Sequence, residues 1–113
     1  MLAHVVLFKP KAGLSGDDRR ALVGAFERAL RNIPTVRGVR VARRVIHGAA
    51  YEHTAPDVAD FLVAIDFDDL DGLHSYLRHP SHEELGRRFN ASIESALVYD
   101  FEIGELSELS SLA

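Results

Sequence analysis

The sequence of 113 residues contains no cysteine. This absence excludes disulfides, thiolate metal sites and cysteine nucleophiles together. It is typical of a protein in a reducing compartment, and we expect a cytoplasmic location. Net positive charge is lacking too, because 13 Lys and Arg stand against 17 Asp and Glu, for a formal net charge of -4. With no overall positive field to attract phosphates, we expect no nucleic-acid partner.

Long apolar runs are also missing. The first apolar run, from Leu2 to Phe8, is interrupted by His4 and stopped by Lys9-Pro10-Lys11, so it has neither the length nor the flanks of a signal peptide or membrane span. No glycine loop of the phosphate-binding type is present, and no serine lies in a nucleophile motif. We therefore expect no membrane association and no cofactor.

The composition that remains is that of one ordinary globular domain. It is 47% hydrophobic and 27% charged, and the length fits a single core. The sequence predicts a domain over residues 1–104. Residues 105–113, which are polar apart from three leucines, are predicted to be a short tail that packs weakly.

The hydrophobic pattern predicts four strands and two helices, the second of them broken. Apolar residues recur every three to four positions from a Ser15 cap to Pro34, and again as far as Leu97, whereas β-branched runs and alternation mark the strands. Pro80 breaks the second helix, and we expect its second part to start with Ser81 as the cap and His82 at the first helical position. The predicted segments are strand 3–9, helix 15–33, strand 36–46, connection 47–56 with Tyr51 and His53 as candidate lid residues, strand 57–67, broken helix 68–97 and strand 99–103.

This order predicts an α+β fold of the ferredoxin-like βαββαβ type, a four-stranded antiparallel sheet with both helices on one face. Apolar side chains alternate onto both faces of the two strands expected to be central, for example Val5 against Val6 and Leu62 against Val63. No remaining segment is long enough to cover the second face. We therefore expect a homodimer, in which a second copy covers it.

Four blocks of the sequence carry a resemblance to a known family. They are Ala3-His4-Val5-Val6-Leu7-Phe8-Lys9, Ile33-Pro34, Tyr76-Leu77-Arg78-His79-Pro80-Ser81-His82 and Val98-Tyr99-Asp100-Phe101. Together, over about residues 2–103, they resemble the stress-responsive dimeric A/B barrel domain, abbreviated Dabb. The Tyr-x-x-His-Pro-x-His segment is the most specific of them. The resemblance implies a ferredoxin-like protomer whose sheet packs against that of its partner, with a cleft between each sheet and its own helices.

The family resemblance leaves several functions open. The family includes stress proteins without a defined biochemical role. Resemblance to them implies a protein that binds a small hydrophobic ligand in the cleft. The family also includes a polyketide cyclase, which implies a lyase acting on a β-keto substrate with His82, Tyr76 and His4 as catalytic residues. A dimeric-barrel monooxygenase is a third, more distant reading. In each case we expect the ligand to contact the residues that face the cleft: His4, Phe8, Tyr76, His79 and His82.

Two further patterns have simpler interpretations. His79 and His82 lie three residues apart beside Glu83, but the second histidine of a zinc-protease motif is missing, so we expect no metal site. Four arginines, Arg37, Arg40, Arg43 and Arg44, accompany the second strand, which should be a sheet edge in this fold. There they are expected to discourage unwanted strand pairing, with an anionic ligand as the alternative.

Overall fold

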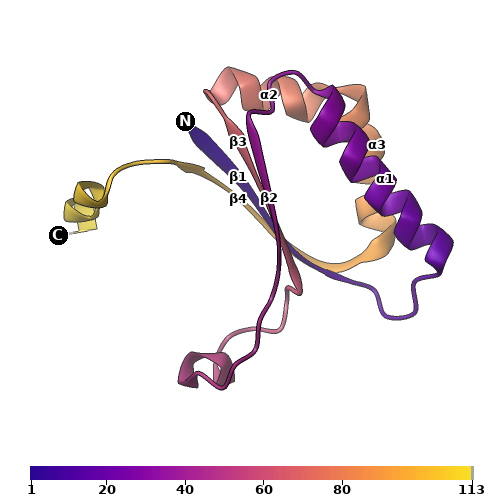
Figure 1. The fold of residues 1–113 in the computed structure, drawn as a ribbon, viewed down its shortest axis with the longest axis horizontal. Helices are drawn as coiled ribbons and strands as arrows, with labels where there is room; N and C mark the ends of the chain where they lie inside the picture. The colour runs from indigo at the N-terminus through magenta and orange to yellow at the C-terminus, as the bar shows by residue number, and fades with distance from the viewer. Residues whose placement is uncertain (113) are drawn as a thin grey trace.

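The structure is a computed structural model that describes residues 1–112. It has four strands, three α-helices and two short 3₁₀ helices (Figure 1). In chain order these are β1 (Leu2–Pro10), α1 (Gly16–Asn32), β2 (Gly38–Arg43), η1 (Ala50–His53), β3 (Phe61–Phe67), α2 (Leu70–Arg78), α3 (Pro80–Ser92), β4 (Ile93–Glu102) and η2 (Leu106–Leu112). Among residues 1–112, no helix has the length and apolar character needed to cross a membrane.

The strands form one antiparallel sheet in the order β2-β3-β1-β4. As predicted, β1 and β3 are the central strands and β2 is an edge. All three α-helices lie on one face of the sheet, and the other face is left open (Figure 1). The predicted α+β, ferredoxin-like protomer is therefore confirmed.

The core lies between the sheet and the helices. Alternate residues of the central strands point into it, so that Val6, Phe8, Val63, Ile65 and Phe67 are buried. Helix α1 begins where Ser15 Oγ accepts a hydrogen bond of 3.0 Å from the Asp18 amide, as its sequence predicts. The fully buried Ala25 and Ala29 lie on its inner face, where their small side chains let the helix approach its neighbours closely.

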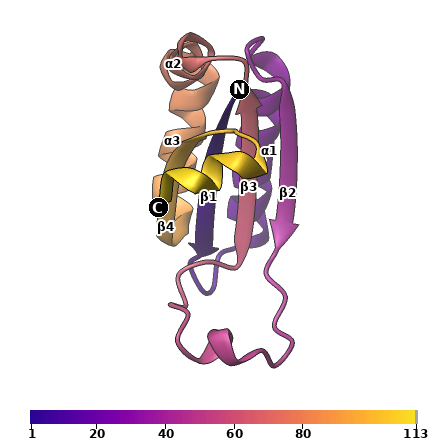
Figure 2. The same ribbon diagram turned by 90° about the vertical axis from the view of Figure 1, so that its left-hand side faces the viewer.

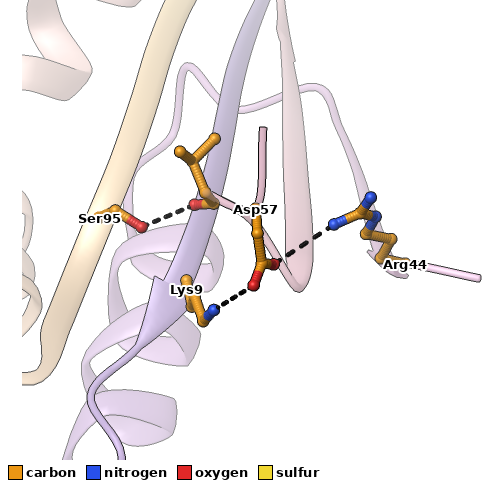
Figure 3. Close-up of polar contacts among 5 residues, drawn as sticks. Lys9, Arg44, Asp57 and Ser95 are labelled. Atoms are coloured by element: carbon orange, nitrogen blue, oxygen red, sulfur yellow. Dashed lines mark hydrogen bonds and ion pairs between the residues drawn. The ribbon is translucent and has the colours of Figure 1, made fainter. Parts of the chain in front are cut away.

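The connection between β2 and β3 projects beyond one end of the sheet (Figure 2). Its return limb is held at three points, shown in Figure 3: Asp57 pairs with Lys9 Nζ at 2.8 Å and with Arg44 at 3.5 Å, and Ser95 Oγ donates to the Val58 carbonyl at 2.9 Å. Farther from the sheet, the Glu52 carboxylate accepts hydrogen bonds from the backbone amides of His47 and Gly48, at the start of this connection. The candidate lid residues Tyr51 and His53 are both exposed.

Two predicted boundaries of the broken helix are wrong. The helix was expected to run to Leu97, but α3 ends at Ser92, and Leu97 lies in the middle of β4 opposite Leu7. Its start is also different, because His79 rather than Ser81 is the cap of α3. The His79 Nδ1 accepts a hydrogen bond of 3.0 Å from the Ser81 amide, and Pro80 takes the first helical position.

The open face of the sheet is apolar. Residues that alternate with the core positions form it, and the apolar ones include Val5, Leu7, Leu62, Ala64, Leu97, Tyr99 and Phe101. The charged Asp66 and Arg40 lie on the same side, toward β2. On β4 the exposed fractions of Leu97, Tyr99 and Phe101 are 37%, 51% and 53%. We call this set the open face.

Candidate functional site

Three aromatic side chains from three elements meet at one end of the helix-covered side of the sheet. They are His4 of β1, Tyr76 of α2 and His82 of α3. The Tyr76 ring lies between the two imidazoles, with its centroid 5.8 Å from that of His4 and 4.8 Å from that of His82. We call these three residues the ring cluster. The three residues that were predicted to be catalytic therefore lie together.

His4 is oriented by a carboxylate. Its Nδ1 lies 2.6 Å from Asp100 Oδ1, and the pairing of β1 with β4 sets the two residues directly opposite each other. His4 itself is buried. Because a carboxylate accepts, the His4 Nδ1 is the donor in this contact and carries a proton.

Asp100 is the site residue that the sequence alone did not reveal. In the sequence, its block Val98-Tyr99-Asp100-Phe101 is only a part of the family pattern. The signal needed to find it is the register of two strands 96 positions apart in the chain, and that register is set by the folded sheet.

Tyr76 is almost completely enclosed, with 1% of its surface exposed. Burial disfavours the phenolate and raises the pKa of its hydroxyl to about 12. Tyr76 also contacts Phe67 of β3, with the ring centroids 5.2 Å apart. At neutral pH the side chain is therefore a protonated hydroxyl that can donate a hydrogen bond.

His82 is partly buried, and its environment favours the neutral imidazole. Burial is the main cause of its lowered pKa, and the nearby His4 lowers it further. A hydrogen bond to the Leu77 backbone carbonyl and the charge of Glu83 act in the opposite direction but do not cancel the shift. A neutral imidazole is the form that can accept a proton.

The other two residues predicted to contact a ligand, Phe8 and His79, are not part of the ring cluster. His79 uses its Nδ1 to cap α3. Phe8 is four residues further along β1 than His4 and packs among Phe26, Phe61 and Phe89, with centroid distances of 5.5 to 5.7 Å. The structure thus divides the predicted contacts between two places on the helix-covered side.

Phe8 lines a cavity of about 830 Å³ between α1 and the β2 and β3 side of the sheet. Most of its wall is apolar, and five charged residues stand among the lining. The lining residues are Phe8, Pro10, Lys11, Leu14, Arg19, Leu22, Val23, Phe26, Glu27, Leu30, Arg31, Val39, Val41, Asp60, Phe61 and Val63. No residue of the ring cluster is among them.

The sequence held a signal for this cavity. Val23 lies beside the buried stripe of α1, and Val39 and Val41 alternate toward the helices from an edge strand, yet all three are exposed in the structure. These apolar residues point toward the helix-covered side of the sheet but are not covered by α1, so the space between them and the helix is not filled by side chains. Among residues 1–112, no three His, Cys, Asp or Glu side chains gather closely enough to hold a metal ion.

The strand order and the placement of all three α-helices on one face put the protein in the class of ferredoxin-like domains with an open sheet face. The sequence profile described as the Stress Responsive A/B Barrel Domain matches residues 2–103. The chain is also 32% identical over 89 residues to the uncharacterized protein SCO4036 of Streptomyces coelicolor, covering 74% of this chain and 80% of that one. The chain belongs to the stress-responsive A/B barrel domain family, as its sequence blocks suggested.

Solved structures share the fold. The Arabidopsis thaliana protein At3g17210 matches with a TM-score of 0.77 at 19% identity, over 94% of this chain and 98% of that one. A hydroxynitrile lyase from Passiflora edulis matches with a TM-score of 0.76 at 14% identity, over 92% and 94%. A dimeric ferredoxin-like protein of unknown function from Thermobifida fusca matches with a TM-score of 0.69 at 20% identity, over 90% of each chain. At these identities the likeness establishes the fold alone.

Proposed function

We propose that this chain acts as a homodimer that binds a small apolar molecule in the cavity between α1 and the sheet. The cavity is the observation that carries the proposal. Its volume of about 830 Å³ falls within the range of small-molecule sites, which are mostly apolar with a few polar groups that fix orientation. Lys11, Arg19 and Arg31 among its lining supply positive charges for a polar end of the ligand.

The dimeric state is supported by the open face. Several large apolar side chains lie there uncovered, and burying each one is worth roughly 1.5 to 3 kcal/mol. Contiguous exposed apolar surface of this kind is typical of an interface rather than of a monomer. The similar Thermobifida fusca protein is described as dimeric, which agrees with the proposal.

A variant that fills the cavity tests ligand binding. Val23→Trp places an indole at an exposed position of the cavity wall, so the fold should tolerate it, and it should weaken binding of 1-anilinonaphthalene-8-sulfonate about tenfold or more in a fluorescence titration. Val45→Trp is the matched control, because Val45 is exposed and does not line the cavity. Equal affinities in the two variants would refute the cavity as the binding site.

A lyase acting on a β-keto substrate is the second candidate, and the ring cluster favours it. His82 is held neutral and can accept a proton from the carbon next to a carbonyl, while Tyr76 is held protonated and can donate a hydrogen bond to the enolate oxygen that forms. His4, oriented by Asp100, can polarise the second carbonyl. The similar Passiflora edulis protein is a lyase, which is consistent with such chemistry on this fold.

Proton exchange tests this second candidate without knowledge of the full substrate. The chain should accelerate deuterium incorporation at the central carbon of a β-keto ester above the buffer rate, followed by NMR. His82→Gln should reduce that acceleration by about 10²-fold or more, and Tyr76→Phe should reduce it as well. His74→Gln, an exposed position on α2, is the control. No acceleration by the wild type, or full acceleration by His82→Gln, would rule the lyase out.

A further inference from the structure

The two edges of the sheet carry opposite charges. The β2 edge is basic, with Arg37, Arg40, Arg43 and Arg44 in or beside the strand. Arg37 is bonded to Asp68, and Arg44 to Asp57. Arg40 and Arg43 are exposed and make no ion pair within residues 1–112. Arg40 lies on the open-face side of β2, whereas Arg43 lies on the helix-covered side, where its guanidinium is 5.9 Å from the centroid of the Phe61 ring. We call Arg40 and Arg43 the basic edge.

Beyond the opposite edge strand, the chain continues as an acidic segment. Glu102 ends β4, and Glu105 and Glu108 follow in the tail; all three are exposed and form no ion pair with another described residue. We call residues 102–112 the acidic arm. Its charge is opposite to that of the basic edge.

The acidic arm also presents apolar side chains that nothing in its own chain covers. Leu106, Leu109 and Leu112 have exposed fractions of 82%, 59% and 83%. They lie three residues apart in η2, and in a 3₁₀ helix such positions eclipse one another, so the leucines form a single stripe. An uncovered stripe at this position needs a partner surface.

The arm extends to the side of the sheet where a second copy would lie. Figure 1 shows η2 standing away from the sheet on its open-face side, and Figure 2, which views that side, shows it in front of the sheet. The backbone leaves the sheet after a hydrogen bond of 2.9 Å from the Ile103 amide to the Met1 carbonyl. Beyond that bond, the arm is directed toward the partner's space.

The direction of the two-fold axis decides which edges of the two packed sheets meet, and the two limiting directions are perpendicular and parallel to the strands. With the axis perpendicular to the strands, β2 of one copy lies beside β2 of the other and β4 lies beside β4. The arginines then face arginines, and the glutamates face glutamates. With the axis parallel to the strands, β2 of one copy lies beside β4 of the other. Like charges repel and opposite charges attract, so the second arrangement is favoured.

We propose that the acidic arm of one copy binds the basic edge of the other by passing around the β2 edge, with Glu105 and Glu108 near Arg40 on the open-face side and Arg43 on the helix-covered side. The leucine stripe is then buried against the partner. This inference rests on the proposed dimer and adds its orientation and its specificity. Because the contact occurs twice in a symmetric pair, four glutamates and four arginines contribute to each dimer.

Charge exchange tests the proposal. One variant reverses the basic edge (Arg40→Glu with Arg43→Glu), and a second reverses the arm (Glu105→Arg with Glu108→Arg). Each alone sets like charges against each other and should weaken dimerisation about tenfold or more at low salt, with a smaller effect in about 0.5 M NaCl. Mixed in equal amounts, the two variants should form a heterodimer about as tight as the wild type, measured by sedimentation equilibrium.

The control for charge alone is Arg87→Glu with Arg88→Glu, two exposed positions on α3 that change the net charge by the same amount as the reversal of the basic edge. It should leave the dimer unchanged. A wild-type dimer that neither reversal weakens would refute the arm contact while leaving the proposed dimer intact. A wild-type monomer would refute the dimer itself, and a mixture that stays weak would show that the two charged groups do not meet between chains.

Removal of residues 105–113 isolates the arm as a whole. The shortened chain ends at Gly104, after the last residue of the sheet, and should fold as the full chain does. It should dimerise at least tenfold more weakly, because the leucine stripe and two glutamates are lost from each contact. An unchanged dimer in this variant would contradict the proposal independently of the charge exchange.

Discussion

At the scale of single residues, the ring cluster contains two groups whose protonation the fold biases in a useful direction. Burial of Tyr76 keeps its hydroxyl protonated, and burial of His82 keeps its imidazole neutral. Both shifts disfavour the charged form, which is the expected result of moving an ionisable group away from water. A proton acceptor and a hydrogen-bond donor thus stand side by side at neutral pH.

The raised pKa of Tyr76 predicts a specific loss of stability in alkali. In the unfolded chain its pKa is near the ordinary value of 10.0, whereas in the folded chain it is about 12. Between these values the unfolded state loses the proton first, so the contribution of Tyr76 is complete below pH 10 and declines as the pH rises toward 12. At about pH 11 the loss should be about 1.4 kcal/mol.

Tyr76→Phe should not show this decline, which urea denaturation at about pH 9 and pH 11 can measure. Tyr51→Phe serves as the control, because Tyr51 is exposed and should behave as the wild type does. If the free energies of unfolding of wild type and Tyr76→Phe fall equally over this range, Tyr76 is not shielded as the structure describes.

Residue patterns in the sequence were sufficient to propose His4, Tyr76 and His82 as site residues. They did not show that the predicted ligand contacts are split between the ring cluster and the cavity. The strand phase places His4 and Phe8 on the same face, and both do point toward the helices. Which helix covers which part of a strand depends on packing between distant segments. For that reason the separation of the cavity from the ring cluster could not be predicted.

At the scale of secondary-structure elements, the junction of α2 and α3 is where a local sequence signal was misread. Ser81 followed by Glu84 matches a capping box, so Ser81 was expected to begin the helix. Proline is favoured at the first helical position, and with Pro80 there the residue before it becomes the cap. His79 is that residue, and its ring nitrogen replaces the usual hydroxyl.

This cap predicts the cost of losing it. His79→Ala should lower the free energy of unfolding by about 1 kcal/mol, because the Ser81 amide loses its acceptor. His79→Asn, which keeps an acceptor at the cap, should retain most of the stability, and His74→Ala at an exposed site should change it little. Urea denaturation of the three variants is the measurement, and a His79→Asn variant as unstable as His79→Ala would contradict the capping role.

The start of β4 shows the limit of periodicity. Leu85, Phe89, Ile93 and Leu97 recur every four residues, which predicts a continuous helix. In the structure Ile93 and Leu97 belong to β4, where a register shift between them leaves Ile93 packed against the core and Leu97 on the open face. Spacing by four therefore does not distinguish the two structures at a boundary. Pairing of Leu97 with Leu7 of the central strand decides in favour of the strand.

At the scale of the whole molecule, the sheet that the sequence predicted to be apolar on both faces is covered on only one. The helices account for the buried face, and the open face retains Leu97, Tyr99 and Phe101 at its β4 side. The acidic arm and the basic edge add opposite charges at the two edges of this surface. These features fit one half of the proposed dimer.

The most direct test of this account is the mass of the wild-type chain in sedimentation equilibrium at low micromolar concentration. We expect twice the chain mass, and we expect Tyr99→Glu with Phe101→Glu to shift the equilibrium to monomer by setting charges within the apolar interface. As a control, Val45→Glu with Ile46→Glu, at exposed positions outside the open face, should remain dimeric. A wild-type chain that sediments as a monomer under these conditions would contradict the account.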